Sequence, residues 1–577
     1  MPHADSYAIS VNNRNSTNID NMRASQIPLE KIYAFDFETT GEANLNAGDD
    51  RVRVWLWSLV SVATDEAYYG TDLDGFLNVL KQHKVKLAFA HNLRFDGSFV
   101  LWHCLKHNIP TEQIIDGHNK AWFSFKALGV EFRDSFKKFP MPLQALAYEL
   151  GMPGKSESPD FNRVIPRGYI PTLKEIKYCI QDARIVAAAI RQEYSAGRMR
   201  LTASSEAYHA LRETIPKFDK IFPALSYAED AFCRRSYGGG ICYLQEDYAE
   251  QEIEGVYVYD INSSYPYQMS EMPMPKGYGY WEEPKRDQLY VVNFTSEFSL
   301  KKKHIPSLLA NRVLRYAVRS DNFIRESDGP TELTMTSVDY ELFHQQYDVD
   351  YEIDHEFISY ERKIGVCRPF IEQEMKGKAE APKFSHTRQK HKLNMNMSYG
   401  SFGINPNAWH VTPVLDDDVI RYDITAEDRV ARYSVFASFV TAWGRHQLIN
   451  AAQRNYDSFI YSDTDSIHLT KPAKGLDIDD KRLGAWKPEC WDGYDCYPFG
   501  KYLRPKAYAH ANEDRRIFRR TLPDGRHDIE LKCAGVPEQA KLSIGWDDFR
   551  LGHVVTGKLQ QAMVPGGVCL INTTYTI

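Results

Sequence analysis

Hydrophobic and polar positions along the chain change period several times, and each period predicts a different kind of element. The run KIYAFDFETTG, from Lys31 to Gly41, alternates as a strand does, and RVRVWLWSLVSVAT predicts a second strand. In PTLKEIKYCIQDARIVAAAIRQEYSAG the apolar residues recur every three to four positions, and Thr172 and Glu175 form a capping box, so this segment predicts a helix. Strands interleaved with helices make residues 30 to 200 an α/β unit.

From about residue 201 the pattern changes to longer mixed segments. Residues 363 to 392 hold eight Lys or Arg against three Glu, and they predict helix on both sides of a break at Pro382. FVTAWGRHQLINAAQRNY predicts another helix, which leads into FIYSDTDSIHL. There two apolar runs enclose Asp463 and Asp465, which predicts a buried hairpin with charges at its tip.

Composition narrows the class of protein. The chain has 577 residues, 43% of them hydrophobic, which suits about three or four domains. A net charge of −7 argues against a protein that coats nucleic acid with its whole surface, but not against a local basic groove. No run of about 18 apolar residues and no secretory signal pattern occurs, so we expect neither a membrane span nor export. Nine scattered cysteines without C-x-x-C favour reduced thiols and no structural zinc.

Acidic side chains of the α/β unit indicate a metal site. Asp36 and Glu38 are two apart on a predicted strand, so they leave the same face about 7 Å apart. Chance alone gives roughly ten acid-x-acid pairs at this composition, so the pair is weak in isolation. Asp96 follows a predicted strand, and Tyr178 and Asp182 share one helical face. Four carboxylates with a tyrosine suit a two-metal phosphodiesterase site, where the hydroxyl orients water. A core tyrosine is the alternative for Tyr178.

A second acidic set lies in the rest of the chain. Asp260 stands at the end of a predicted strand in VYDINSSYPYQM, 205 residues before Asp465 (465 − 260). If the two strands are neighbours in one sheet, Asp260, Asp463 and Asp465 converge on a pair of Mg²⁺ ions, and these cations account for charges on an apolar hairpin. A solvent-exposed turn is the alternative, since Asp is an ordinary turn residue.

Between these acids, KLNMNMSYG places Lys392, Asn396 and Tyr399 on one helical stripe. Such a stripe offers a cation to a triphosphate, and an amide and an aromatic face to a sugar and a base. The alternative is a tyrosine packed in a core, with the lysine extending past it to solvent.

Together these motifs resemble those of B-family DNA polymerases. D-x-x-S-x-Y-P, K-x-x-x-N-x-x-Y-G and Y-x-D-T-D-S look like polymerase motifs A, B and C, and the segments of Asp36, Asp96 and Asp182 resemble the three motifs of DEDDy proofreading exonucleases. SYGGG resembles the motif linking the two activities, KAY the primer-gripping motif, and LKCAG with VPGGV the thumb. Length and spacing are similar to the compact protein-primed polymerases of small tailed bacteriophages, over nearly everything after residue 30.

The resemblance implies roles for individual residues. The metal ligands would be Asp36, Glu38, Asp96 and Asp182 at the exonuclease site, and Asp260, Asp465 and the carbonyl of Ile261 at the polymerase site. Tyr178 would position water, and Asp463 would stand beside the polymerase metals as a further catalytic residue. The nucleotide would contact Tyr265, which excludes a 2′-hydroxyl, and Lys376, Lys392, Asn396 and Tyr399, with Lys378 as the alternative to Lys376. DNA or the terminal protein would contact Asn92, Phe95, Ser135, Phe136, Phe139, Tyr237, Gly239, Gly240, Lys506 and Tyr508. Arg163 falls where the family usually has a lysine near the exonuclease metals.

The resemblance also implies the architecture. We expect an α/β and α+β multidomain chain, with an RNase H-like exonuclease domain followed by a right-hand polymerase that carries two family-specific insertions. The expected parts are a disordered leader (1–30), the exonuclease domain (31–200), palm (201–272), palm with the first insertion (273–363, the insertion itself from about 312), fingers (364–403), the second insertion (404–432), palm (433–532) and thumb (533–577).

The expected activity is template-directed DNA synthesis with 3′–5′ proofreading and strand displacement in phage genome replication, using two Mg²⁺ per site or Mn²⁺ in their place. Expected partners are template and primer DNA, dNTPs, a terminal protein as primer and a single-stranded DNA-binding protein, for a monomer in the cytoplasm of an infected bacterium. The alternatives are a 3′–5′ nuclease whose C-terminal half only binds DNA, and a replication scaffold with inactive sites. A reverse transcriptase is disfavoured, because that group usually reads Y-x-D-D at this turn.

Overall fold

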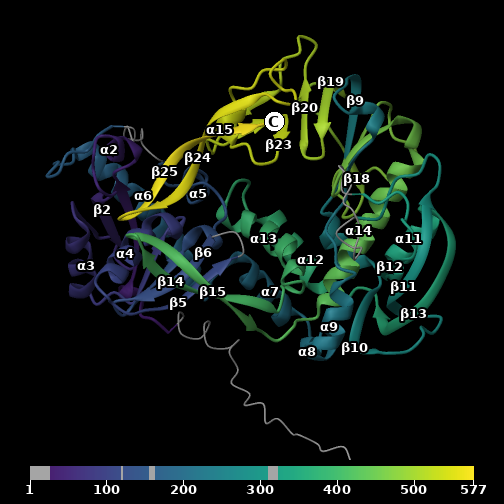
Figure 1. The fold of residues 1–577 in the computed structure, drawn as a ribbon, viewed down its shortest axis with the longest axis horizontal. Coiled ribbons are helices and arrows are strands. Elements are labelled where there is room, and N and C mark those ends of the chain that lie inside the picture. The colour runs from purple at the N-terminus through teal and green to yellow at the C-terminus, as the bar shows by residue number, and fades with distance from the viewer. Residues whose placement is uncertain (1–25, 118–120, 155–162, 310–322) are drawn as a thin grey trace, which may run out of the picture.

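The computed structural model describes residues 26–117, 121–154, 163–309 and 323–577. Most of the expected leader and residues 310–322, in the range expected for the first insertion, lie outside the described residues. Figure 1 shows the N-terminal unit on one side, the large C-terminal sheet on the other and helices between them. In the described part of the chain, no helix has the length and apolar character needed to cross a membrane.

Alternation along β1 (Ile32–Thr39) divides the N-terminal unit into two cores. The first core receives the odd-numbered side chains of the strand, Tyr33, Phe35 and Phe37. The second receives the side chains of residues 32 and 34 and is covered by α6 (Leu173–Ser195). Asp36 and Glu38 continue this second series, so the strand directs both carboxylates to the side of the sheet that α6 covers.

The sheet around β1 has seven strands in the order β3-β2-β1-β4-β7-β6-β5, with β4 parallel to both β1 and β7. Its elements besides β1 and α6 are α2 (Glu42–Asn46), β2 (Val54–Ser61), β3 (Ala67–Gly70), α3 (Leu73–Gln82), β4 (Leu87–Ala90), α4 (Leu93–Lys106), β5 (Thr111–Gly117), β6 (Ala121–Ala127), β7 (Val130–Asp134), the 3₁₀ turn η3 (Ser135–Lys137) and α5 (Leu143–Glu149). The strands and helix predicted from the sequence are confirmed, and both hydrogen bonds of the Thr172/Glu175 capping box are present.

The second large sheet brings together strands from distant parts of the chain. Its order is β23-β20-β19-β9-β17-β16-β8, and β18 pairs with β9 as well. The predicted hairpin becomes β16 (Phe459–Asp463) and β17 (Ser466–Leu469). β17 lies antiparallel to β9 (Glu252–Ile261), with Ser466 opposite Asp260. The neighbouring strands that the acidic motifs required are therefore present.

The remaining elements of this expected palm surround the sheet. They are α7 (Ala203–Thr214), α8 (Phe218–Ile221), α9 (Tyr227–Arg234), β8 (Cys242–Leu244), α10 (Ser264–Glu271), α14 (Ser434–Arg454), β18 (Trp486–Glu489), β19 (Tyr497–Arg504), β20 (Ala507–Ala511), β21 (Arg519–Thr521), β22 (His527–Ile529) and β23 (Leu531–Cys533). The buried residues of α14 belong to two adjoining cores, so this helix supports the sheet and the helices beside it.

Two elements lie outside the large sheets, one within the range expected for palm with the first insertion (273–363) and one within the range expected for the second insertion (404–432). A four-stranded sheet in the order β10-β13-β11-β12 consists of β10 (Met274–Tyr280), β11 (Leu289–Leu300), β12 (Thr331–Thr336) and β13 (Tyr347–Lys363), with α11 (Ser337–Gln346) packed against it. A separate hairpin pairs β14 (Asn407–Asp416) with β15 (Val419–Asp428). The exact domain boundaries stay predictions.

The basic segment forms the two helices predicted on either side of Pro382. They are α12 (Arg368–Glu380) and α13 (His386–Met397), and the side chain of Ser385 caps the second. The chain ends with α15 (Glu538–Lys541) and a long hairpin of β24 (Val554–Val564) and β25 (Gly567–Thr576). This hairpin returns to the N-terminal unit (Figure 1), where the Val52 amide donates to the Pro565 carbonyl at 3.0 Å.

Two carboxylate sites of the candidate enzyme

A cleft of ≈ 1160 Å³ collects the first acidic set. Its lining from the N-terminal unit includes Asp36, Glu38, His91, Asn92, Phe95, Asp96, Phe136, Met141, Tyr178 and Asp182. The C-terminal hairpin supplies Gly557, Leu559, Gln561, Leu570 and Asn572 to the same cleft. All four predicted metal-ligand carboxylates and Tyr178 are therefore brought together, as the motif spacing required.

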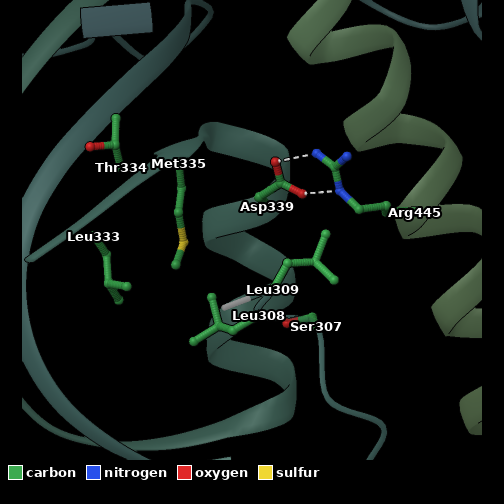
Figure 2. Close-up of a pocket in the computed structure, with 8 residues that line it drawn as sticks. All are labelled: Ser307, Leu308, Leu309, Leu333, Thr334, Met335, Asp339 and Arg445. Carbon is green, nitrogen blue, oxygen red and sulfur yellow. Dashed lines mark hydrogen bonds and ion pairs between the residues drawn. The ribbon is translucent and has the colours of Figure 1, made fainter. Parts of the chain in front are cut away.

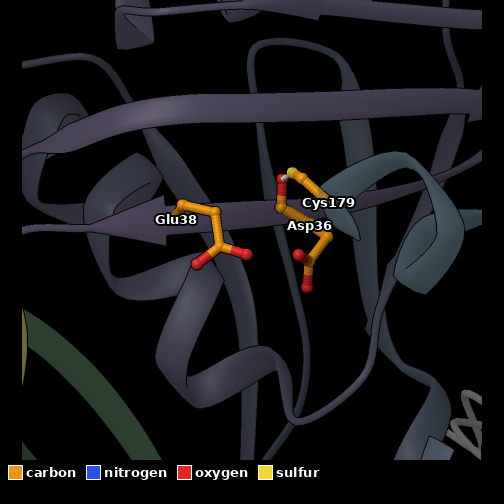
Figure 3. A group of neighbouring side chains, drawn as sticks. All are labelled: Asp36, Glu38 and Cys179. Carbon is orange, nitrogen blue, oxygen red and sulfur yellow. Dashed lines mark hydrogen bonds between the residues drawn. The ribbon is translucent and has the colours of Figure 1, made fainter. Parts of the chain in front are cut away.

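Asp36 and Glu38 project from β1 beside a cysteine that sequence reasoning did not include (Figure 3). Ligand atoms of Asp36, Glu38 and Cys179 all lie within 4.8 Å of one another. The Cys179 thiol contacts the Asp36 carbonyl at 3.5 Å, and burial together with the nearby carboxylates raises its pKa well above the ordinary value. Cys179 therefore stays a neutral thiol, and the hard oxygen donors of the two carboxylates are the groups suited to Mg²⁺.

Asp96 enters the cleft from the first turn of α4. Its carboxylate accepts a hydrogen bond from the Phe37 amide at 3.0 Å, which ties the helix to β1. Burial, reinforced by Asp134 and Asp182 and opposed by backbone amides, raises the pKa of Asp96 to about 8. Carboxylates crowded in this way repel one another unless a cation lies among them.

Local backbone geometry presents the residue before α4 to the cleft. Asn92 has a left-handed backbone (φ 73°), and its amide donates to the Asp134 carboxylate at 2.9 Å. Asparagine tolerates this conformation better than most residues do. Its side chain is exposed at the cleft, beside the half-buried Phe95.

The segment DSFKKF corrects the expected contacts with DNA. Phe136 is 38% exposed and lines the cleft, but Ser135 and Phe139 are buried. The Ser135 hydroxyl donates to the Ala90 carbonyl at 3.1 Å, and Phe139 packs in the second core. Met141, two residues further on, takes a place in the cleft wall instead. Ser135 and Phe139 therefore support the cleft and do not face it.

Two further residues clarify the edges of this site. Arg163 forms an ion pair with Glu175 and a hydrogen bond with Tyr169, so it fastens the start of α6. His91 was missed by sequence reasoning, although it directly precedes Asn92 in HNLRFDG. Its ring nitrogens contact the Ser135 hydroxyl at 3.0 Å and the Met141 carbonyl at 2.9 Å.

The second acidic set meets where the end of β9 lies beside the start of β17. The Ile261 amide donates to the Asp465 carbonyl at 2.8 Å, which fixes the two acidic segments together. Burial and then the Asp465 charge raise the pKa of Asp260 to about 8. Burial and then Asp463 raise the pKa of Asp465 to about 6. Asp260 and Asp465 therefore form a crowded pair, and the exposed-turn alternative is wrong.

Asp463 faces a different partner. Its carboxylate forms an ion pair with Lys506 at 3.1 Å and accepts from the Cys242 thiol at 2.8 Å. Tyr508 packs on Tyr461 with ring centroids 5.2 Å apart, behind the same hairpin. The KAY segment is thus fastened to the hairpin through Asp463.

The turn between β16 and β17 holds a strained residue. Thr464 has φ 62°, in the left-handed region that a β-branched residue rarely adopts. Its amide donates to the Ile241 carbonyl at 2.8 Å. A Cβ on Gly240 would lie 2.7 Å from the Thr464 side chain, whereas one on Gly239 would have nothing within 4 Å. The last glycine of SYGGG, Gly240, therefore makes room for the acidic turn.

The rest of SYGGG is held by a buried arginine. Arg445 of α14 donates to the carbonyls of Gly238 and Gly239 at 2.9 and 2.8 Å. It also makes two hydrogen bonds to Asp339 of α11, beside a small cavity of ≈ 30 Å³ (Figure 2). Tyr237 packs close against Gly403, where an added Cβ would lie 2.7 Å from its ring. These contacts join the loop to the inserted sheet.

The predicted nucleotide stripe is present with one change. Lys392 and Asn396 are exposed on α13, and the Tyr399 ring lies 4.6 Å from that of Tyr265. Burial, with Lys392 and Arg388 nearby, lowers the pKa of Lys378. The side chain of Lys376 is 76% exposed and near Glu380 instead. Lys378, and not Lys376, is therefore the α12 lysine that joins the basic stripe.

Comparison with known proteins agrees with this geometry. A family model described as DNA polymerase type B, organellar and viral, matches residues 168–482. The DNA polymerase of Bacillus phage B103 is 31% identical, with 95% of this chain and 99% of that protein covered. For the DNA polymerase of Bacillus phage phi29 the identity is 30%, with the same coverage.

Solved structures extend the comparison to the fold. The phi29 DNA polymerase complexed with primer-template DNA and incoming nucleotide substrates superimposes with a TM-score of 0.84 at 27% identity, covering 95% of this chain and 100% of that one. The resemblance inferred from the motifs is confirmed. The chain belongs to the organellar and viral family of type B DNA polymerases, and is a DNA-directed DNA polymerase.

Proposed function

We propose that this polymerase extends DNA at the Asp260/Asp465 site and removes nucleotides from 3′ ends at the cleft of Asp36. The observation that carries the proposal is the presence of two crowded carboxylate sets on two different sheets. The matched family model spans much of the C-terminal half, so a nuclease whose C-terminal half only binds DNA has little support.

Both sets fit Mg²⁺ as the cofactor, with Mn²⁺ in its place. The donors are carboxylate oxygens, and burial together with neighbouring carboxylates raises the pKa values of Asp96 and Asp260, a crowding that a bound cation would relieve. Asp36, Glu38, Asp96 and Asp182 would hold the ions of one site, and Asp260, Asp465 and the Ile261 carbonyl those of the other. When bound, such ions neutralise phosphate charge and lower the pKa of an attacking hydroxyl.

Residues of the palm and the helix pair would arrange the substrates for extension. Lys392 and Lys378 would bind the triphosphate, and Asn396 would contact the nucleotide from the same stripe. Tyr265, packed between Tyr399 and Gly444, would stack under the sugar and leave no room for a 2′-hydroxyl. The primer 3′-hydroxyl then attacks the α-phosphate, and pyrophosphate leaves. Lys506 and Tyr508 would hold the primer strand beside this site.

In the cleft of the N-terminal unit the reaction would be hydrolysis. Tyr178 would orient the attacking water, while Asn92, Phe95 and Phe136 would hold the single-stranded 3′ end. The phi29 DNA polymerase has been solved in complexes with primer-template DNA, with primer-template DNA and incoming nucleotides, and with single-stranded DNA. These are the partners proposed for this chain.

Similarity to phage polymerases over 95% of the chain supports a role in phage genome replication. We extend the proposal to priming by a terminal protein, strand displacement and work beside a single-stranded DNA-binding protein, as a monomer in the host cytoplasm. The β14–β15 hairpin and the inserted sheet are the elements proposed to serve priming and displacement.

One assay tests the division into two sites. Three purified proteins are compared: the wild type, Asp465→Asn and Asp36→Ala/Glu38→Ala. Each is mixed with Mg²⁺, labelled dNTPs and primed single-stranded DNA. We expect Asp465→Asn to abolish extension and to keep hydrolysis, and the double variant to do the reverse. Loss of both activities in either variant would contradict two separate sites, provided that thermal unfolding shows both variants folded.

A further inference from the structure

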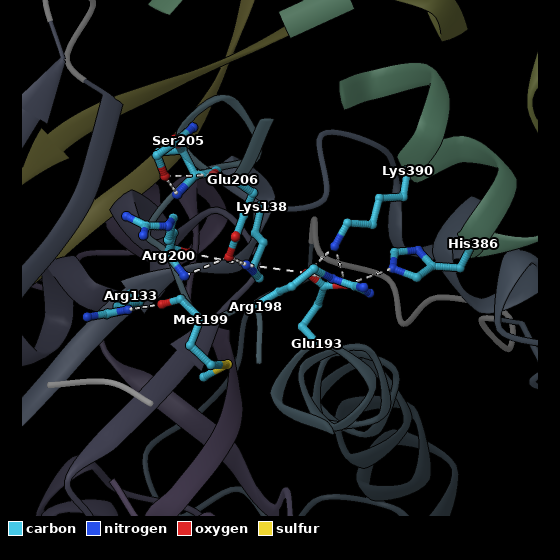
Figure 4. Close-up of polar contacts among 11 residues, drawn as sticks. Arg133, Lys138, Glu193, Arg198, Met199, Arg200, Ser205, Glu206, His386 and Lys390 are labelled. Atoms are coloured by element: carbon cyan, nitrogen blue, oxygen red, sulfur yellow. Dashed lines mark hydrogen bonds and ion pairs between the residues drawn. The ribbon is translucent and has the colours of Figure 1, made fainter. Parts of the chain in front are cut away.

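A buried carboxylate connects the N-terminal unit to α13, the helix that carries Lys392 and Asn396. Glu193, near the end of α6, is 3% exposed. Four cationic side chains surround it: Lys138 at 3.5 Å, Arg198 at 2.7 Å, Lys390 at 3.2 Å and His386 at 3.6 Å (Figure 4). We call these five residues the Glu193 cluster. His386 and Lys390 belong to α13, Lys138 belongs to the N-terminal unit, and Arg198 lies just after α6.

The cluster holds one face of α13, and the nucleotide stripe lies on another. His386 and Lys390 are four residues apart, so they share a face. Lys392 follows Lys390 by two positions, which turns it about 200° around the helix axis. The buried side is also fixed within the helix pair, since Glu374 of α12 accepts from His391 at 2.8 Å and from Asn394 at 3.1 Å. The Glu193 cluster adds the link to the N-terminal unit.

The same helix reaches the other site. α6 carries Tyr178 and Asp182 in the cleft, and Glu193 follows Asp182 by 11 residues (193 − 182), about 16 Å along the axis at 1.5 Å per residue. One rigid element therefore supports proofreading groups at one end and α13 at the other. A shift of α13 relative to α6 would change the position of Lys392 without moving the cleft.

We propose that Glu193 is a positioning residue for nucleotide binding: by anchoring His386 and Lys390 it holds α13 so that Lys392 and Asn396 face the polymerase site. This inference rests on the proposed role of the stripe in binding the incoming nucleotide.

Electrostatics gives the reason why loss of the carboxylate would move the helix. Burial opposes the charge of Glu193, but His386, Lys138 and Arg198 outweigh it and lower its pKa to about 2. Without this charge, Lys138, Arg198 and Lys390 would face one another as like charges. Glu206, which contacts Lys138 at 2.8 Å, would still hold that lysine, whereas Lys390 would lose its ion pair with Glu193 and could move away.

Titration of His386 adds a dependence on pH. Burial alone would lower the pKa of His386, but Glu149 at 3.7 Å and Glu193 at 3.6 Å raise it above its ordinary value. The other charged groups near this ring are Lys138, Arg198 and Lys390 of the cluster, and Arg526, which faces Glu149. Because the folded pKa is raised, the protonated ring contributes fully below about pH 6.5, and its contribution is lost as the pH rises through the raised value.

The test compares single-nucleotide incorporation by Glu193→Gln, Glu193→Asp and Lys390→Met with the wild type. We expect Glu193→Gln to raise KM for dNTP by about tenfold with kcat changed less than about threefold, and Glu193→Asp to restore most of the affinity. Lys390→Met should raise KM less, and the double variant Glu193→Gln/Lys390→Met should fall short of the summed effect, because it removes both members of the pair. Lys383→Met, an exposed charge just before α13, is the matched control and should match the wild type.

Further measurements separate the possible failures. Hydrolysis of single-stranded DNA should stay within about twofold in all these variants, since Glu193 lies outside the cleft. KM for dNTP should rise with pH above about 6.5 in the wild type and more weakly in His386→Gln. A lowered Tm with an unchanged KM in Glu193→Gln would reduce the cluster to a structural role and overturn the inference. If Lys392→Ala also leaves KM unchanged, the proposed nucleotide stripe fails instead.

Discussion

At the residue scale, the two lysines of MKGKAE show what sequence could and could not decide. Lys376 and Lys378 differ by two positions, which on a helix places them on nearly opposite sides of the axis. The spacing between these lysines and motif B allows either one to contact the triphosphate, because the loop around Pro382 determines how α12 packs on α13. The structure places Lys378 near Lys392 and Arg388.

We expect Lys378→Ala to raise KM for dNTP by about tenfold or more, since a hydrogen bond to a charged group contributes about 1.5–3 kcal/mol. Lys376→Ala is the matched control and should stay within about twofold, because that side chain is 76% exposed beside Glu380. Steady-state incorporation of one nucleotide measures both. Equal effects of the two changes would refute the assignment.

The direction of each carboxylate side chain could be predicted from local secondary structure alone. Asp36 and Glu38 follow the period of a strand, and Tyr178 and Asp182 that of a helix, so local geometry fixes their directions. The burial of Ser135 and Phe139 could not be predicted, because it depends on what packs over them. Phe139 contacts His386, a residue of a distant helix, with ring centroids 5.4 Å apart. No local pattern encodes that contact.

At the element scale, the acidic hairpin depends on a glycine from another segment. SYGGG passes under the turn of β16 and β17, and Gly240 fits there because it has no side chain to meet Thr464. The hairpin itself was predictable from its two apolar runs. Its pairing with β8 was not predictable, and its pairing with β9 was suggested only by the acidic residues on both strands, since strand pairing across about 200 residues is decided by the whole core.

Gly240→Ala should displace the acidic turn, because the new Cβ would lie 2.7 Å from the Thr464 side chain and 3.0 Å from its Cα. Overpacking of this kind costs about 1–3 kcal/mol, and the shift of Asp465 should lower kcat for extension at least about tenfold. Gly239→Ala has open space at its Cβ and should leave the Tm unchanged. Differential scanning calorimetry and primer extension provide the two readings. An active Gly240→Ala enzyme would show that the turn tolerates the displacement.

At the scale of the whole molecule, the last strands of the chain complete a site that begins at residue 36. The β24–β25 hairpin contributes Leu559, Gln561, Leu570 and Asn572 to the cleft of the N-terminal unit. More than 500 residues separate these groups from Asp36, so neither spacing nor periodicity could reveal the contact. The signal that sequence offered was VPGGV, which marks a turn and gives no sign of what the turn touches.

The turn of this hairpin packs closely against the segment that precedes β2. A Cβ on Gly566 would lie 2.1 Å from the Val52 carbonyl oxygen, and this glycine has φ 92°. Gly552 has a similar φ of 81°, but a Cβ there would have nothing within 4 Å. Alanine would be strained by the positive φ at either position, but only at Gly566 would its Cβ also clash with a neighbouring atom.

We therefore expect Gly566→Ala to detach the hairpin turn from the N-terminal unit and to raise KM for hydrolysis of single-stranded DNA by about fivefold, because one wall of the cleft moves away. Incorporation of a single dNTP should stay within about twofold, since the Asp260/Asp465 site lies on the other sheet. Gly552→Ala introduces similar backbone strain, so it should also lower the Tm, but it should leave both activities unchanged. Hydrolysis that is equally affected in both variants would assign the defect to strain alone, and the hairpin would then be no part of the proposed exonuclease site.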